Sequence, residues 1–149
     1  MAPDPEVKDA TRRLDGISIL VAEDDPVSLA MLEFNLAEYG ASLTLVGDGR
    51  QAVERVIADG PAAYDIVLMD IQMPEMDGYT AARRILQMSA DLPIVGQTVH
   101  AYGEERDKCF AAGMADHIAK PIDFAQLVDL VLKLVPTNRR RRAVPPAGN

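Results

Sequence analysis

The segment 65–78, DIVLMDIQMPEMDG, constrains the fold of this chain more than any other part. Its apolar run at 66–69 is typical of a buried strand, and this run ends at a single carboxylate, Asp70. Pro74 and Gly78 then interrupt regular structure, which predicts a loop. Because open α/β sheets bind ligands beyond the carboxyl ends of their strands, an acid at this position indicates a functional site.

Three other apolar segments also end in polar side chains. Parallel strands carry their carboxyl ends at one edge of the sheet, so these groups are expected to converge. Carboxylates, a hydroxyl and an ammonium can together hold a hard cation and a phosphoryl group. The segments are 17–22 before Glu23, Asp24 and Asp25, then 92–97 before Thr98, and 118–119 before Lys120 and Pro121.

Helical patterns separate these strands. Gly60 and Pro136 are stop signals, and Asp25, Asp48 and Asp123 are expected N-caps. The alternation predicts an α/β fold: a doubly wound, five-stranded parallel sheet with helices on both faces. The expected helices are 26–40, 48–60, 79–88, 102–112 and one that follows Asp123, with a further strand at 42–46.

The apolar positions predict which side of each helix packs inward. Helix 102–112 is the weakest, because it is highly charged and contains Gly103. Its apolar face is thin and consists of Cys109, Phe110 and Ala112. The faces expected to be inward elsewhere are Leu29, Leu32, Leu36 and Tyr39 in the first helix, Val53, Val56 and Ile57 in the second, and Leu127, Val128, Leu130, Val131, Leu134 and Val135 in the last.

Composition predicts one soluble domain. The 149 residues include one cysteine and carry a formal net charge of −8. Because the body is acidic, nucleic acid is not expected as a direct ligand. No apolar run approaches the roughly 20 residues of a membrane helix, and we expect a cytoplasmic protein. The expected organisation is a lead-in at 1–15, a domain at 16–136 and a disordered basic tail at 137–149.

These motifs together resemble the receiver domain of two-component response regulators. The resemblance covers roughly 17–135 and rests on Glu23-Asp24, the MDIQMP run at 69–74, Thr98 and Lys120-Pro121. It is most similar to the receivers of hybrid sensor kinases. It implies a flavodoxin-like sheet with strand order 2-1-3-4-5, and a cis peptide bond between Lys120 and Pro121.

The resemblance also assigns roles to the residues of the site. Asp70 would be the phosphoacceptor. Mg²⁺, for which Mn²⁺ can substitute, would be held by Asp24, Asp70 and the backbone carbonyl of Gln72, with Glu23 acting through water. The simpler alternative is that the acids only cap the first helix, which fits Asp25 well.

Three further residues would respond to the phosphoryl group. Lys120 would pair with its oxygens, Thr98 would donate its hydroxyl, and His117 occupies the position of the switch aromatic residue. The alternatives are a solvated lysine, an ordinary strand-end threonine and a packed ring. Two departures from the family pattern stand out: Gln72 replaces the commoner asparagine, and Val99 is bulkier than the usual alanine.

The expected function is that of a phosphorylatable signalling receiver rather than an enzyme, with weak self-dephosphorylation. Its partner would be a sensor histidine kinase or a histidine phosphotransfer protein, and the output partner is unknown. A homodimer could form through the helix 102–112, the strand at 118–119 and the last helix. Two rival functions are a phosphate-independent binding module and an aspartate-nucleophile, Mg²⁺-dependent phosphatase of the haloacid dehalogenase type. That phosphatase family requires Asp-x-Asp, whereas Gln72 stands two residues after Asp70.

Overall fold

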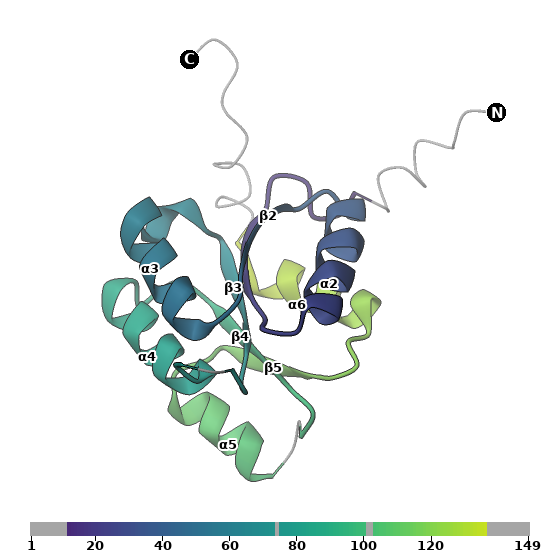
Figure 1. The fold of residues 1–149 in the computed structure, drawn as a ribbon. Coiled ribbons are helices and arrows are strands. Elements are labelled where there is room, and N and C mark those ends of the chain that lie inside the picture. Colours follow the sequence, from purple (N-terminus) through teal and green to yellow (C-terminus); the bar gives the residue numbers. More distant parts are fainter. Residues whose placement is uncertain (1–11, 74, 101–102, 137–149) are drawn as a thin grey trace, which may run out of the picture.

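The computed structural model describes residues 12–73, 75–100 and 103–136, and its centre is a five-stranded sheet (Figure 1). All four strand pairs are parallel, and the order β2-β1-β3-β4-β5 confirms the predicted topology. The strands are β1 (Ser18–Ala22), β2 (Ser42–Val46), β3 (Ile66–Asp70), β4 (Ile94–Thr98) and β5 (Asp116–Ala119).

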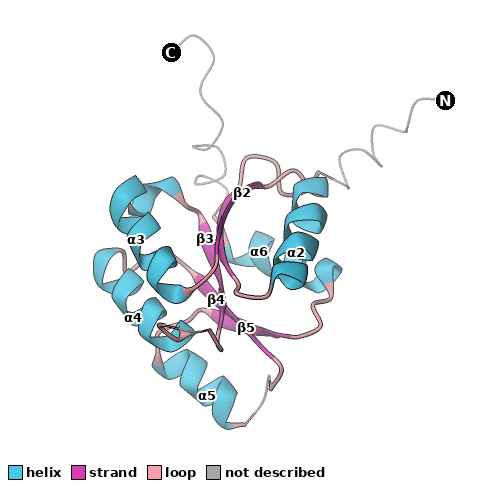
Figure 2. Ribbon diagram, in the orientation of Figure 1, coloured by secondary structure: helices cyan, strands magenta, loops and turns pink. Residues whose placement is uncertain are grey.

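Helices cover both faces of the sheet (Figure 2). One face carries α2 (Pro26–Glu38) and α6 (Phe124–Leu134), and the other carries α3 (Gly49–Asp59), α4 (Gly78–Met88) and α5 (Glu104–Ala111). A 3₁₀ turn, Pro61–Ala63, precedes β3. Two separate apolar cores fill the layers, one with Leu32, Leu36, Leu127 and Val131 and the other with Val53, Val56, Ala82 and Ile85.

Within the described ranges, aspartate side chains start four of the five α-helices. Asp25, Asp48, Asp77 and Asp123 each accept a hydrogen bond from a backbone N–H three residues later. Three of these caps were predicted from the sequence. Because each cap directly follows a strand or its loop, the helix N-termini lie at the edge where the strands end.

Three side chains differ from the sequence expectations. Ile57 was predicted to face inward, but it is 65% exposed. Phe110 is also exposed, and Arg106 lies over its ring, 5.8 Å from the centroid. Leu14 falls in the expected lead-in, yet it is fully buried, and its N–H donates to the carbonyl of Tyr39. Periodicity alone cannot place residues at the margin of a helix face or before the first strand.

Some predictions fall on residues outside the described ranges. These are the disordered tail, most of the lead-in, Pro74 and the start of the helix expected at 102. Within the described residues, that helix begins at Glu104 and buries Cys109 alone, which agrees with the thin apolar face that we predicted. The peptide bond between Lys120 and Pro121 is cis, as the resemblance implied.

Candidate functional site

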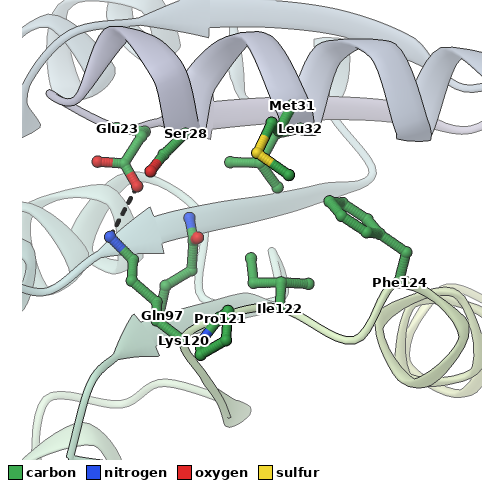
Figure 3. Close-up of a pocket in the computed structure, with 9 residues that line it drawn as sticks. All are labelled: Glu23, Ser28, Met31, Leu32, Gln97, Lys120, Pro121, Ile122 and Phe124. Atoms are coloured by element: carbon green, nitrogen blue, oxygen red, sulfur yellow. Dashed lines mark hydrogen bonds and ion pairs between the residues drawn. The ribbon is translucent and has the colours of Figure 1, made fainter.

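Asp70 ends the central strand β3 and is 5% exposed. The ammonium of Lys120, which follows β5, donates to Asp70 Oδ2 at 3.1 Å and to Glu23 Oε1 at 2.7 Å. The pair between Glu23 and Lys120 is drawn in Figure 3. The backbone N–H of Lys120 donates to the carbonyl of Thr98, so the ladder between β4 and β5 continues to the lysine and fixes its position. Three strands therefore bring these charges together.

A cluster of three carboxylates completes the centre. Glu23, Asp24 and Asp70 each offer an oxygen, and these oxygens all lie within 4.8 Å of one another. Glu23 is buried and accepts a second hydrogen bond, from the N–H of Asp25, whereas Asp24 is exposed at the rim. An all-oxygen donor set with one face open to solvent fits Mg²⁺, which keeps several water ligands. The sequence-predicted metal residues are thus close enough to bind one ion.

The charges within this centre shift its pKa values. Burial, followed by the hydrogen bond with Glu23, raises the pKa of Asp70 to about 7, and Lys120 offsets only part of this effect. For Glu23, burial acts upward, but hydrogen bonds with Asp70 and Lys120 outweigh it, so the pKa of Glu23 is lowered. One positive charge does not balance two buried carboxylates, and a cation at Asp24 would complete the neutralisation.

The loop after β3 turns tightly around Asp70. The N–H of Gln72 donates to Asp70 Oδ1 at 3.2 Å, and the N–H of Gly78 donates to the carbonyl of Ile71. A Cβ atom at Gly78 would lie 2.3 Å from the carbonyl oxygen of Asp70, so the start of α4 approaches the strand too closely for any side chain. The Gln72 side chain is exposed over this edge.

Thr98 and His117 lie on neighbouring strands. Thr98 ends β4, is 4% exposed, and its Oγ1 accepts a hydrogen bond from the N–H of His100. His117 is partly buried in β5, and its ring meets that of Phe110 edge-on, with 6.1 Å between centroids. Val99 is exposed beside the site.

Two features of this region were not identified from the sequence. Tyr79 at the start of α4 donates a hydrogen bond to Glu105 of α5, and both line the hollow beside Asp24 and Gln72. The side chain of Gln97 is fully buried on β4, after the apolar residues of that strand and directly before Thr98. The spacing of residues in the sequence could not reveal the contact between Tyr79 and Glu105, because this contact depends on how α4 and α5 pack. The second feature was visible only as one glutamine at the end of an apolar strand.

The family model for the response regulator receiver domain matches residues 19–132. The chain belongs to this family. It is 34% identical to the signal transduction histidine-protein kinase BarA of Escherichia coli, over 89% of this chain but only 14% of that protein. It is also 34% identical to histidine kinase 1 of Arabidopsis thaliana, over 83% of this chain and 13% of the other. The receiver domain thus spans a small part of these curated relatives.

A solved structure also resembles this chain in sequence and fold. The receiver domain of the sensor histidine kinase PA1611 from Pseudomonas aeruginosa is 36% identical, with a TM-score of 0.71 over 80% of this chain and 97% of that one, and it was solved with a magnesium ion coordinated in the active site cleft. The relatives confirm the family resemblance and its likeness to hybrid kinase receivers. In the part of the chain that the structure describes, no helix combines the length and the apolar character needed to cross a membrane.

Proposed function

We propose that this receiver accepts a phosphoryl group on Asp70 from a phosphohistidine donor, in the presence of Mg²⁺, and signals through the resulting change in conformation. The observation that carries the proposal is the contact of the buried Asp70 carboxylate with the Lys120 ammonium, inside a cluster of three acids. Such a carboxylate is a usable nucleophile toward phosphorus when the incoming charge is neutralised.

The transfer is an in-line displacement. An oxygen of Asp70 forms a bond to phosphorus while the bond between phosphorus and the donor imidazole nitrogen breaks, and the imidazole leaves with the electron pair. Lys120 already binds Asp70 Oδ2 and can follow an incoming phosphoryl oxygen with little movement. Thr98 would donate its hydroxyl to another oxygen.

The residues that would hold Mg²⁺ are Asp24, Asp70 and the carbonyl of Gln72, with Glu23 acting through water. When bound, the ion would neutralise the carboxylates and the phosphoryl oxygens. Two observations support this assignment. The three acids converge, and the backbone N–H of Gln72 donates a hydrogen bond to Asp70 Oδ1, which holds this part of the loop beside the acids. The magnesium-bound receiver of PA1611 is consistent with it.

The test is acid-labile phosphorylation by a small phosphodonor with Mg²⁺, in the parent and in Asp70→Asn. We expect the variant to lose the label. Asp65→Asn is the matched control, because Asp65 is also buried beside β3, at the opposite edge, where it accepts from the N–H of Ser18. Labelling of Asp70→Asn equal to that of the parent would exclude Asp70 as the acceptor.

We infer that the donor is a sensor histidine kinase or a histidine phosphotransfer protein, and that it docks on α2. Val27, Met31 and Phe34 form an exposed apolar stripe on this helix, which begins beside the acids. Phe34→Ala should slow transfer from a protein donor and leave labelling by a small phosphodonor unchanged. If Phe34→Ala slows phosphorylation equally with both donors, or does not slow it with either donor, α2 is not the docking surface. The homodimer through α5, β5 and α6 stays a prediction.

We expect slow loss of phosphate from Asp70, without turnover of an external substrate. A phosphatase of the haloacid dehalogenase type would need a second acid two residues after its nucleophile, and Gln72 is found there. A phosphate-independent binding module has no need for the buried ion pair between Lys120 and the two acids. Steady-state release of phosphate from an excess of a phosphate ester would favour the phosphatase.

A further inference from the structure

Gln97 is the most unusual buried side chain of the described residues. Neighbouring Gly96 faces the α5 side of the sheet, where an added Cβ would meet Met114 and Cys109, while Val95 belongs to the core under α2 and α6. Gln97, two residues after Val95, therefore points toward α2 and α6. It is 0% exposed, and neither its Oε1 nor its Nε2 has a hydrogen-bond partner within the described ranges.

The amide of Gln97 points into a cavity. Figure 3 shows it directed into the space between α2 and the segment that follows Lys120. The cavity has a volume of about 130 Å³, and Met31, Leu32, Ile122 and Phe124 form its apolar walls. Buried polar groups are ordinarily paired, so an unpaired amide aimed into a cavity of this kind indicates a missing partner.

The size and lining of the cavity favour a ring over water alone. A buried water molecule needs two to four polar partners, and an apolar cavity of comparable volume can bind a single benzene ring. Here the walls are mainly aliphatic and aromatic, and Met31 is exposed at the surface, which leaves a route for entry.

The remaining polar groups of the cavity are already engaged. Glu23 Oε1 accepts from Lys120, Glu23 Oε2 accepts from the N–H of Asp25, and the hydroxyl of Ser28 donates to Asp25. An anion would meet the buried Glu23 and a cation would meet Lys120, so the cavity favours a neutral molecule. Gln97 alone offers an unused donor and an unused acceptor side by side.

We propose that this cavity is a binding site for an uncharged, single-ring molecule that carries adjacent N–H and C=O groups, as a lactam does. The N–H of the ligand donates to Gln97 Oε1, and its carbonyl accepts from Gln97 Nε2. The ring packs against Leu32, Ile122 and Phe124. The site lies behind the phosphoacceptor centre and shares Glu23 and Lys120 with it, but its occupant makes no use of phosphate.

The probe is 2-pyridone, which has this pair of groups on one ring, and toluene is the apolar comparison. Backbone amide shifts are followed by NMR in protein free of Mg²⁺ and of phosphodonor, so that the result does not depend on the proposed phosphorylation. We expect saturable shifts at Ser28, Leu32, Gln97 and Ile122. We also expect 2-pyridone to bind about tenfold to a hundredfold more tightly than toluene, as two net hydrogen bonds would give.

Two variants complete the test. Gln97→Leu should lose the preference for 2-pyridone, because leucine has a similar size but no amide. Gln87→Leu, the same change at an exposed position of α4, should keep it. The proposal is overturned if 2-pyridone gives no saturable shifts up to its solubility limit, if toluene binds equally well to the parent, or if Gln97→Leu retains the preference.

Discussion

At Asp70, reactivity and stability oppose each other. The carboxylate must be ionised to attack phosphorus, but burial and the neighbouring Glu23 raise its pKa to about 7. Lys120 supplies one positive charge and binds both carboxylates. The centre is therefore arranged for a further cation and a phosphoryl group, and in their absence it retains repulsion between acids that is expected to destabilise the fold.

Burial of Asp70, together with the neighbouring Glu23, predicts a pH dependence of stability. The pKa of Asp70 is raised from 3.8, so its contribution to stability is fully present below about pH 4 and is lost as pH rises through about 7. In chelator, Asp70→Asn should melt at a higher temperature than the parent at about pH 8, and the difference should shrink toward about pH 5. Asp65→Asn controls for loss of a buried acid. A benefit of Asp70→Asn that is the same at both pH values would contradict this explanation.

Asp24 allows a test of the metal site that leaves the core intact, because its side chain is exposed. Mg²⁺ at 100 times its dissociation constant should stabilise the folded parent by about 2.7 kcal/mol. Asp24→Ala should remove most of this gain while its melting temperature in chelator stays close to that of the parent. The check is thermal melting across a Mg²⁺ titration, and an undiminished shift in the variant would show that Asp24 is not a ligand.

At the scale of elements, α4 is placed by the close approach of Gly78 to β3. An added methyl group would lie 2.3 Å from the carbonyl oxygen of Asp70, so the helix must shift. We expect Gly78→Ala to lower the free energy of unfolding by about 1–3 kcal/mol and to slow phosphorylation. Gly47→Ala is the control, because its nearest contact would be 3.8 Å away. Chemical denaturation measures the free energy of unfolding of both variants. Equal losses of stability in Gly78→Ala and Gly47→Ala would contradict the steric argument.

The helix α5 is the element most suited to move. Among the α-helices of the described residues it is the shortest, and Cys109 is the only residue that it buries there. Its N-cap is Gly103, which has no side chain to accept a hydrogen bond from the first turn. We expect its amides to exchange fastest among the helices, and we expect their exchange rates to change most when beryllofluoride mimics the phosphoryl group.

Thr98→Ala should still accept phosphate but lose much of this change in the exchange of α5. If the exchange of α5 in the variant changes as strongly as in the parent, the coupling runs through Lys120 or the loop after Asp70.

For the whole molecule, the folded unit should end at Val135, which is fully buried in the core under α2 and α6. A chain truncated after Pro136 should keep its melting temperature and its phosphorylation rate, because the residues removed have no apolar periodicity. A drop in melting temperature on truncation would show that the tail contributes to the fold.

Local patterns predicted the alternation of strands and helices and the polar residues at the strand ends, whereas the strand order 2-1-3-4-5 came only from the family resemblance. Apolar strands that end in Asp70, Thr98 and Lys120 define the sheet and its functional edge together. The exposed Ile57 and the buried Leu14 were missed, since burial at such margins is decided by which elements pack nearby. The cavity at Gln97 could not be predicted either, because its volume depends on the spacing between α2 and α6.

The identity of the phosphorylated residue tests the central claim most directly. Borohydride reduces an aspartyl phosphate to homoserine and leaves free carboxylates unchanged, so the modified peptide can be located by mass spectrometry after phosphorylation with Mg²⁺. We predict homoserine at position 70 and at no other aspartate, including Asp24 and Asp65. Conversion at another position, or a stable label with no conversion at Asp70, would contradict the assignment of Asp70 as the phosphoacceptor.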